Sequence, residues 1–289
     1  MISRQTFLIA AVVSLAGAVQ AAETRPFVFT AIPDQDETRL VERFSKVAVY
    51  LEANLGVPVK YVPVKSYPAA VTAFVNGEVQ LAWFGGFTGV QARLAQPGAR
   101  AIAQGAEDAS FKSLMIANAA SGLKPSPDFP KAIEGKSFTF GARASTSGRV
   151  MPEYFIRAAF GGRAPDEVFR QVGFSGDHSR TIQVVQSGAY EIGVLDYSVW
   201  ELERKAGKVD ESKVSVIWES PPFLDYQWTA RGDIDAIYGA GFTSKLTATL
   251  LAIDSKSILE QFGRSKFIAA KNEDYAPIEA VARASGLLN

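Results

Sequence analysis

The chain contains no cysteine and a single histidine, His178, among its 289 residues. The lack of cysteine excludes disulfide bonds, thiolate metal sites and a lipid anchor on an N-terminal cysteine. One histidine alone leaves too few ligands for a zinc site of the usual kind. We therefore expect no bound metal and no cofactor.

An excess of charge of one sign is also lacking, because 30 basic residues balance 30 acidic ones. No basic tract or stripe stands out along the chain. Proteins that bind nucleic acid or anionic membranes usually carry such a basic footprint. We expect neither partner, and any anion site must rely on local hydrogen bonds and dipoles.

A long hydrophobic run occurs only near the N-terminus. Arg4 precedes an apolar stretch at residues 7–18, and residues 19–21 (VQA) place small side chains where signal peptidase requires them. The stretch is shorter than the roughly 20 residues that span a bilayer. Residues 1–21 are therefore predicted to be a signal peptide, cleaved after Ala21, that directs the mature chain to the periplasm.

Short apolar runs alternate with helical patterns through the rest of the chain. This order is typical of βαβ units, in which helices cover a parallel sheet. The first units comprise predicted strands at residues 27–32, 57–64 and 79–84, and predicted helices at 40–55 and 67–76.

The same order of elements returns 111 residues later without a shift of register. Helix, strand and glycine positions keep this offset for more than 60 residues. Such a long match indicates a duplication, because core-facing positions must keep their period. Matched positions include Phe27 with Phe138, Phe29 with Phe140, Ala31 with Ala142 and Gly77 with Gly188.

The duplication predicts an α/β fold of two similar lobes joined by a two-strand hinge. Residues 22–113 and 223–289 are expected to form lobe 1, and residues 114–222 to form lobe 2. Extended segments at 111–117 and 214–223 are predicted to cross between the lobes. The helical patterns after residue 244 would complete lobe 1.

Ligands of parallel α/β sheets bind beyond the carboxyl ends of the strands, where helix N-termini converge. The most informative loop there is Ser145, Thr146, Ser147 and Gly148, which directly precedes a helical pattern. Hydroxyl groups, free backbone N–H groups and the positive end of a helix dipole together form an anion site. A plain N-cap needs only one serine, so three consecutive hydroxyls favour an anion site.

His178 opens a helix at the same predicted cleft, and the offset of 111 puts it in register with Tyr67 of lobe 1. One donor from each lobe could hold a single ligand and favour closure. A lone histidine is more often structural than functional, and that alternative stays open.

Four further residues follow predicted strands. Asp196, next to Tyr197, either accepts a proton from a protonated ligand or caps the following helix. Gly85, next to Phe84, either lets the backbone approach a ligand closely or forms a tight turn. The acidic run at residues 34–37 is interpreted mainly as the cap of the first helix, with a ligand contact as the alternative.

Four segments together resemble the phosphonate- and phosphite-type periplasmic binding proteins of ABC transporters, over essentially the whole mature chain. The resemblance implies a type II periplasmic binding protein fold, an ABC permease of the inner membrane as partner, and a small oxyanion as ligand. It also implies that Phe84 stands where phosphonate binders tend to have a tyrosine. The segments are 64–67 (VKSY), 81–85 (LAWFG), 145–148 (STSG) and 176–178 (GDH), and the implied oxyanion ligands are Ser145, Thr146, Ser147, Tyr67 and His178.

Within that family, residues 31–38 and 83–87 look most similar to a branch named for selenate binding. The choice among phosphonate, phosphite, selenate and selenite stays open. A related branch of arsenite sensors looks to a cysteine for its ligand, and this chain has none.

Three functions compete on this cleft. The leading interpretation is the receptor of an ABC importer, with no catalytic residues. The second is a sensory receptor that presents the same ligand to a histidine kinase. A cleft enzyme is the remote alternative, because the sequence has no Gly-x-Ser-x-Gly nucleophile elbow. We expect a monomer, since two-lobed receptors must open and close freely.

Overall fold

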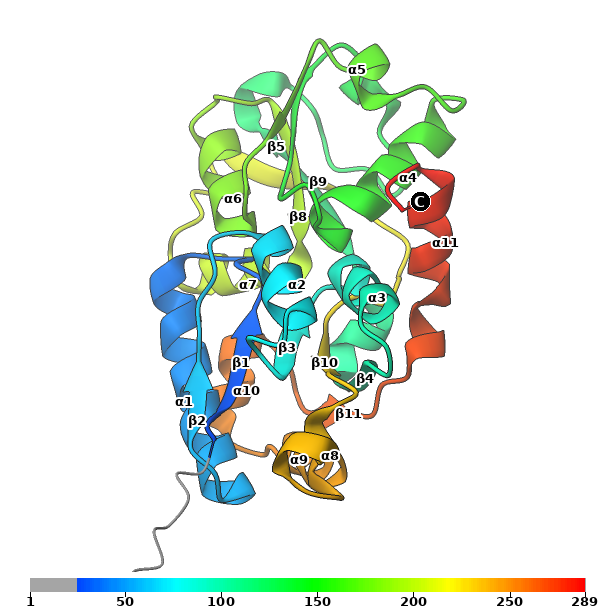
Figure 1. Cartoon of the computed structure of the whole chain (residues 1–289). Helices are drawn as coiled ribbons and strands as arrows, with labels where there is room; N and C mark the ends of the chain where they lie inside the picture. Colours follow the sequence, from blue (N-terminus) through cyan, green and yellow to red (C-terminus); the bar gives the residue numbers. More distant parts are fainter. Residues whose placement is uncertain (1–24, 289) are drawn as a thin grey trace, which may run out of the picture.

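The computed structural model describes residues 25–288. The predicted signal peptide at residues 1–21 lies outside these residues. Within them, no helix combines the length and hydrophobicity that a membrane span requires. The described chain is organised around two β-sheets, one in each half of the molecule (Figure 1).

The first sheet has six strands in the order β11-β4-β10-β3-β1-β2. Strand β1 pairs in parallel with β2 and β3, whereas β10 runs antiparallel to both of its neighbours. We keep the name lobe 1 for this sheet and the helices on it. The strands are β1 (Phe27–Ala31), β2 (Val59–Tyr61), β3 (Leu81–Phe84), β4 (Arg100–Gly105), β10 (Gln227–Ala230) and β11 (Phe267–Ile268).

The second sheet, the centre of lobe 2, has five strands in the order β7-β6-β8-β5-β9. Strand β6 pairs in parallel with its neighbours β7 and β8. Strand β5 runs antiparallel to β8. The strands are β5 (Ser113–Asn118), β6 (Ser137–Phe140), β7 (Gln171–Phe174), β8 (Ile192–Asp196) and β9 (Val214–Glu219).

Helices cover both sheets (Figure 1). Lobe 1 carries α1 (Glu37–Leu55), α2 (Tyr67–Val75), α3 (Gly86–Ala95), α8 (Ile234–Tyr238), α9 (Phe242–Leu251), α10 (Lys256–Phe262) and α11 (Ala276–Ala284). Lobe 2 carries α4 (Met151–Ala159), α5 (Pro165–Val168), α6 (His178–Gln186) and α7 (Tyr197–Lys205). Short turns are η1 (Ala106–Ser110), η2 (Ala119–Ser121), η3 (Lys131–Ile133), η4 (Thr146–Val150) and η5 (Asn272–Tyr275).

The internal repeat is visible in these boundaries. Helices α2 and α6 begin 111 positions apart, and so do strands β3 and β8. The copies differ at the first helix, because α1 is one helix of 19 residues whereas lobe 2 has the π-helical turn η4 followed by α4 and α5. The predicted α/β architecture of two lobes is confirmed.

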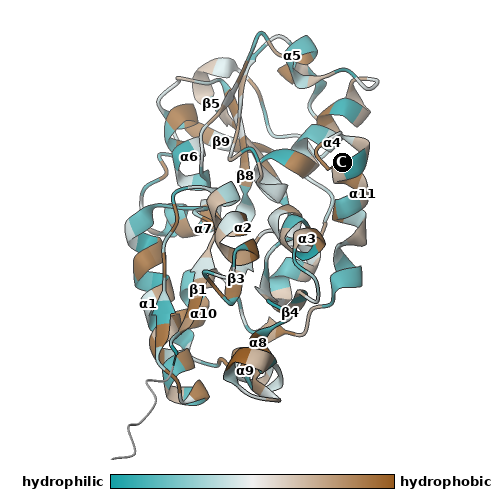
Figure 2. Cartoon of the chain, in the orientation of Figure 1, coloured by the Kyte–Doolittle hydropathy of each residue, from teal (hydrophilic) through white to brown (hydrophobic). Residues whose placement is uncertain are grey.

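Helix α1 shows how the sequence sets such an element. The Asp36 carboxylate caps it by accepting from the N–H groups of Thr38 and Arg39, and Gly56 ends it in the left-handed conformation. Its residues alternate between hydrophobic and hydrophilic along the helix (Figure 2), and the buried stripe includes Phe44. The rings of Tyr61, Trp228 and Phe262 pack on Phe44 with centroids 4.9 to 6.0 Å away.

The two crossings between the lobes meet at one point. Phe111 and Phe223 form an antiparallel bridge, in which each N–H donates to the other's carbonyl at 2.7 and 2.9 Å. The prediction of crossings at 111–117 and 214–223 was too long. Residues 113–118 and 214–219 are strands β5 and β9 of the second sheet, paired side by side.

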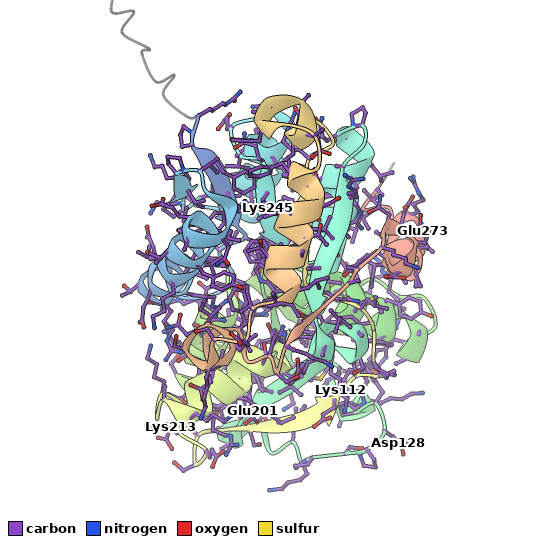
Figure 3. The ribbon with its side chains drawn as sticks, turned by 90° about the horizontal axis from the view of Figure 1, so that it is seen from below. Lys112, Asp128, Glu201, Lys213, Lys245 and Glu273 are labelled. Atoms are coloured by element: carbon purple, nitrogen blue, oxygen red, sulfur yellow. The ribbon has the colours of Figure 1, made fainter. Side chains whose placement is uncertain are left out.

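The C-terminal part returns to lobe 1, as expected, and also contacts lobe 2. Lys245 of α9 donates to the Leu55 carbonyl at the end of α1 at 2.8 Å, and Figure 3 shows Lys245 among the helices of that lobe. Helix α11, however, contacts α3 of lobe 1 and α4 and η4 of lobe 2. It lies along the edge of the molecule between the two halves (Figure 1). The expectation that the tail completes only lobe 1 was therefore incomplete.

Candidate functional site

The loop of three hydroxyls opens the π-helical turn η4, directly after β6. Ser145 is its N-cap, and the Ser145 Oγ accepts from the Gly148 N–H at 3.0 Å. The N–H groups of Thr146 and Ser147 stand at the start of the turn, where a helix leaves donors available for an anion. Single π-helical turns are frequent at functional sites.

The three hydroxyls make different contacts, although each residue is at most 2% exposed. Ser145 caps the turn, as described above. The Thr146 Oγ1 accepts from the N–H of Phe87 in lobe 1 at 3.0 Å, so it joins the lobes. The Ser147 Oγ bonds to no other described residue, while the Ser147 carbonyl is held by the Ser113 hydroxyl at 2.7 Å. Ser147 thus presents a buried hydroxyl, which lies beside the carboxyl of Asp225.

Tyr67 and His178 meet at Ser145. Tyr67 is the first residue of α2. Its hydroxyl is buried beside Ser145. His178 is the first residue of α6, and its Nε2 lies 3.5 Å from the Ser145 Oγ. Burial raises the pKa of Tyr67 well above its ordinary value, so its hydroxyl keeps the proton and can donate. Donors from both lobes therefore converge on the hydroxyl loop.

The hydrogen bonds of His178 fix its tautomer. Its Nδ1 lies 3.3 Å from the backbone N–H of Asp196 and must accept from it. The neutral ring then carries its proton on Nε2, the atom that faces Ser145. The backbone N–H of His178 donates to the Asp34 carbonyl of lobe 1 at 3.0 Å. His178 thus offers an N–H donor to the site and also ties α6 to lobe 1.

Asp225 is a candidate site residue that was not predicted from the sequence. It follows the second crossing and is 1% exposed. Its Oδ1 accepts from the Gly86 N–H at 2.9 Å, whereas its Oδ2 has no partner among the described residues. The carboxyl also lies beside the hydroxyls of Thr146 and Ser147 across the lobe boundary. The only local signal was an acid in an apolar stretch, residues 223–228 (FLDYQW).

Burial raises the pKa of Asp225 to about 7, and the nearby carboxylate of Asp196 adds to this shift. The Gly86 N–H and the hydroxyls of Thr146 and Ser147 act in the opposite direction but do not outweigh burial. Near neutral pH this carboxyl can therefore either donate or accept a proton from a bound anion.

Close packing at the start of α3 favours a glycine at position 85. A Cβ on Gly85 would lie 3.1 Å from the Asp225 Oδ1 and 3.2 Å from the Thr146 Oγ1. Both distances are tighter than ordinary van der Waals contact. The φ of Gly85, −74°, needs no glycine, and its close neighbours are the Asp225 and Thr146 side chains; the predicted approach to a ligand stays a prediction.

Asp196 acts as a helix cap. Its Oδ1 accepts from the Ser198 N–H, the Ser198 hydroxyl and the Val199 N–H, and its Oδ2 accepts from the Tyr226 hydroxyl at 3.0 Å. Both oxygens are thus occupied by protein groups. The capping alternative explains Asp196, and its predicted contact with a ligand proton is withdrawn in favour of Asp225.

Phe84 and Tyr197 do not join the hydroxyl cluster through any contact seen here. Phe84 is fully buried, and its ring packs edge-on against Phe74 of α2 at 5.5 Å between centroids. The Tyr197 ring lies 4.7 Å from that of Phe111, at the hinge. Both therefore support the framework around the site.

A hollow of about 680 Å³ opens at the edge of the site, between the lobes. Tyr67 is part of its wall, whereas the three hydroxyl residues are not. A wider groove of about 1030 Å³ lies on lobe 2 between β9 and α4, and none of the site residues lines it. The candidate site is therefore the buried cluster of Tyr67, Ser147, His178 and Asp225, beside the smaller hollow. No group of three potential metal ligands occurs within residues 25–288.

Comparisons with known proteins concern the chain as a whole. A family model described as the phosphonate periplasmic substrate-binding protein of ABC transporters matches residues 29–275. The chain is 40% identical over 260 residues to the probable ABC transporter phosphite-binding protein PhnD1 of Prochlorococcus marinus (strain MIT 9301), which covers 88% of this chain and 87% of that protein.

Solved structures give the same result. The structure of PhnD1 from Prochlorococcus marinus (MIT 9301) with methylphosphonate superposes with a TM-score of 0.87 at 38% identity, covering 92% of this chain and all of that one. A binding protein of a Pseudomonas aeruginosa ABC phosphonate transporter has a TM-score of 0.75 at 20% identity, covering 89% and 85%. The fold is therefore that of type II periplasmic binding proteins, as the resemblance implied.

Proposed function

This chain belongs to the periplasmic substrate-binding proteins of phosphonate ABC transporters, and we propose that it captures phosphite or a small phosphonate between its lobes and delivers it to an inner-membrane permease. The relative PhnD1 is named a probable phosphite-binding protein, and its solved structure holds methylphosphonate. The proposal therefore prefers phosphite and phosphonates to selenate or selenite, and transport to sensing or catalysis.

One observation carries the proposal: buried donors without protein partners come together from both lobes. The Tyr67 hydroxyl comes from lobe 1 and the Ser147 hydroxyl from lobe 2, and the Nε2–H of His178, 3.5 Å from the Ser145 Oγ, faces the same loop. Buried donors without acceptors are unfavourable, and an oxyanion supplies the acceptors. No arginine or lysine is needed, because the start of η4 adds N–H donors and a helix dipole.

Asp225 gives the site a reason to prefer a basic oxyanion. Its partnerless Oδ2 can share one proton with an oxygen of the ligand. Phosphite and phosphonate oxygens take up a proton near neutral pH, whereas sulfate and selenate stay fully ionised. A proton shared between groups of similar basicity makes a stronger hydrogen bond, so we expect the site to favour phosphorus oxyanions.

Titration calorimetry of the mature protein with phosphite, methylphosphonate, selenite, selenate and sulfate tests the proposal. We expect the first two ligands to bind at least tenfold more tightly than sulfate and selenate. Ser147→Ala should weaken their binding by about tenfold, the usual effect of losing a hydrogen bond to a charged group. Ser187→Ala, an exposed serine at the end of α6, is the matched control.

Two results would contradict the proposal. Binding of sulfate or selenate as tight as that of phosphite would refute the role of Asp225 as a proton partner. The absence of binding across the whole panel would refute the oxyanion site.

We further propose that the signal peptide is cleaved after Ala21, which mass spectrometry of the exported protein would show as a chain beginning at Ala22.

A further inference from the structure

A second, much smaller space lies between the lobes, separate from the hydroxyl loop. Its volume is about 10 Å³. Asp34, Gln35 and Arg43 line it from lobe 1, and Asp196 and Ser198 close it from lobe 2. About 10 Å³ is room for one water molecule and is far too little for a tetrahedral oxyanion. This space is therefore not part of the oxyanion site.

Three buried polar atoms on its walls have no hydrogen bond to any described residue. They are the Oδ1 of Asp34, the Oε1 of Gln35 and the Nε of Arg43, on residues that are 2%, 5% and 4% exposed. Buried polar groups in native proteins are nearly always paired, and each of these three needs a partner. Two of them are acceptors and one is a donor.

A single water molecule matches this set. It has two O–H donors for Asp34 and Gln35 and a lone pair for the N–H of Arg43. We propose that the closed protein binds one water molecule between its lobes, held by Arg43, Asp34 and Gln35 and sealed in by Asp196 and Ser198.

The charges around the space favour a neutral guest over an ion. Arg43 and Arg264 line the space together with the carboxyls of Asp34 and Asp196, and the Arg264 guanidinium is also paired with Asp108 at 2.6 Å. A bound cation would be repelled by the arginines, and a bound anion would be repelled by the carboxylates. A water molecule carries no charge and avoids both repulsions.

This water site would position the segment on which lobe 2 closes. The Asp34 carbonyl accepts from the N–H of His178, the residue that presents its ring to the oxyanion. The bound water fixes the Asp34 and Gln35 side chains next to that carbonyl. Arg43 and Gln35 are thus positioning residues for closure, and they act without touching the ligand. The inference builds on the proposed function only in so far as closure accompanies binding.

The direct test is a crystal structure of the mature protein with methylphosphonate, at a resolution that shows ordered water. We expect one density peak within hydrogen-bonding distance of the Arg43 Nε, the Asp34 Oδ1 and the Gln35 Oε1. A closed structure in which Arg43 bonds directly to Asp34 and the space is gone would overturn the inference. That result would leave the proposed function intact.

A variant pair tests the consequence in solution. Gln35→Leu removes one acceptor and fills the space with an apolar side chain, so Kd for phosphite and for methylphosphonate should rise by the same factor, about five- to twentyfold. Gln183→Leu, an exposed glutamine of α6, should bind both as the unchanged protein does. Unchanged affinity in Gln35→Leu, or a loss for only one of the ligands, would contradict a role in closure. If Gln35→Leu does not fold, the crystal structure of the unchanged protein still decides.

Discussion

Asp225 shows how burial converts a common residue into a selective one. An exposed aspartate is ionised throughout the physiological range. Here the carboxyl is enclosed between the start of α3 and the hydroxyl loop, and burial raises its pKa to about 7. Protonation of this one group therefore changes within the range in which phosphite and phosphonates also gain or lose a proton.

We expect the affinity for phosphite to fall as the pH rises above the pKa of Asp225. Below pH 7 Asp225 carries a proton and can donate it to the ligand, whereas above pH 7 its carboxylate repels a doubly charged anion. We expect affinity for phosphite to fall by up to tenfold for each pH unit above about 7. Calorimetry between pH 6 and pH 9 would measure this, and heats in buffers of different ionisation enthalpy would show proton uptake.

Asp225→Asn tests whether Asp225 causes this pH dependence. An amide keeps an oxygen that can accept from the Gly86 N–H, and its N–H₂ group donates at every pH. The variant should lose the decline above pH 7 and should bind sulfate better than the unchanged protein does. The same steep decline in Asp225→Asn would assign the pH dependence to the ligand alone.

At the scale of single elements, the proposed site consists mainly of residues at helix starts. Helices α2, α6 and η4 each place a site residue at or next to the first position: Tyr67, His178 and Ser147. Their capping residues, Ser66, Asp177 and Ser145, make the local bonds that fix these starts. The duplicated element order supplies the matched starts, and the change of the first helix into a π-helical turn sets lobe 2 apart.

Asp196 stabilises a single element, because its carboxylate caps the start of α7. Asp196→Ala removes the acceptor of three cap bonds and of the Tyr226 hydroxyl, which should lower stability by about 1–3 kcal/mol. The melting temperature of the ligand-free protein should drop by about 3–10 °C. Differential scanning calorimetry would measure this drop. The ratio of Kd values for phosphite and sulfate should stay as it is, and a change in that ratio without loss of stability would return Asp196 to the ligand site.

At the scale of the whole molecule, bonds between protein groups hold the lobes together. They include the Phe87 N–H to the Thr146 Oγ1, the His178 N–H to the Asp34 carbonyl, and the Tyr226 hydroxyl to Asp196, each at 3.0 Å. The two chain crossings meet at Phe111 and Phe223, so opening is expected to bend the chain there. The apparent affinity for any ligand depends on how readily this closed form is reached.

Tyr226→Phe tests how much the bond between Tyr226 and Asp196 contributes to ligand affinity. It removes one hydroxyl and leaves the ring on Trp83, whose centroid is 5.5 Å away. The closed form loses one bond across the lobes, so Kd for phosphite and methylphosphonate should rise together by about three- to tenfold. Small-angle X-ray scattering should still show compaction by saturating ligand. A selective effect on one ligand would instead place Tyr226 in contact with the oxyanion.

Much of this protein followed from the sequence alone, because some signals are local or periodic. The offset of 111 gave two α/β lobes, and strand and helix spacing placed Tyr67 and His178 at matching helix starts. The hydroxyl triplet was recognisable because capping chemistry is local. Family resemblance then indicated a small oxyanion and left phosphonate, phosphite, selenate and selenite open.

Only the tertiary structure decided which carboxylate serves which purpose. Asp34, Asp196 and Asp225 are all at most 2% exposed, but one borders the small space between the lobes, one caps α7 and one faces the hydroxyls. Asp225 lies 79 residues after Thr146 in the chain, and no periodicity links the two. Their proximity arises because the chain crosses the hinge twice, and burial, which shifts the pKa, exists only once the lobes have met.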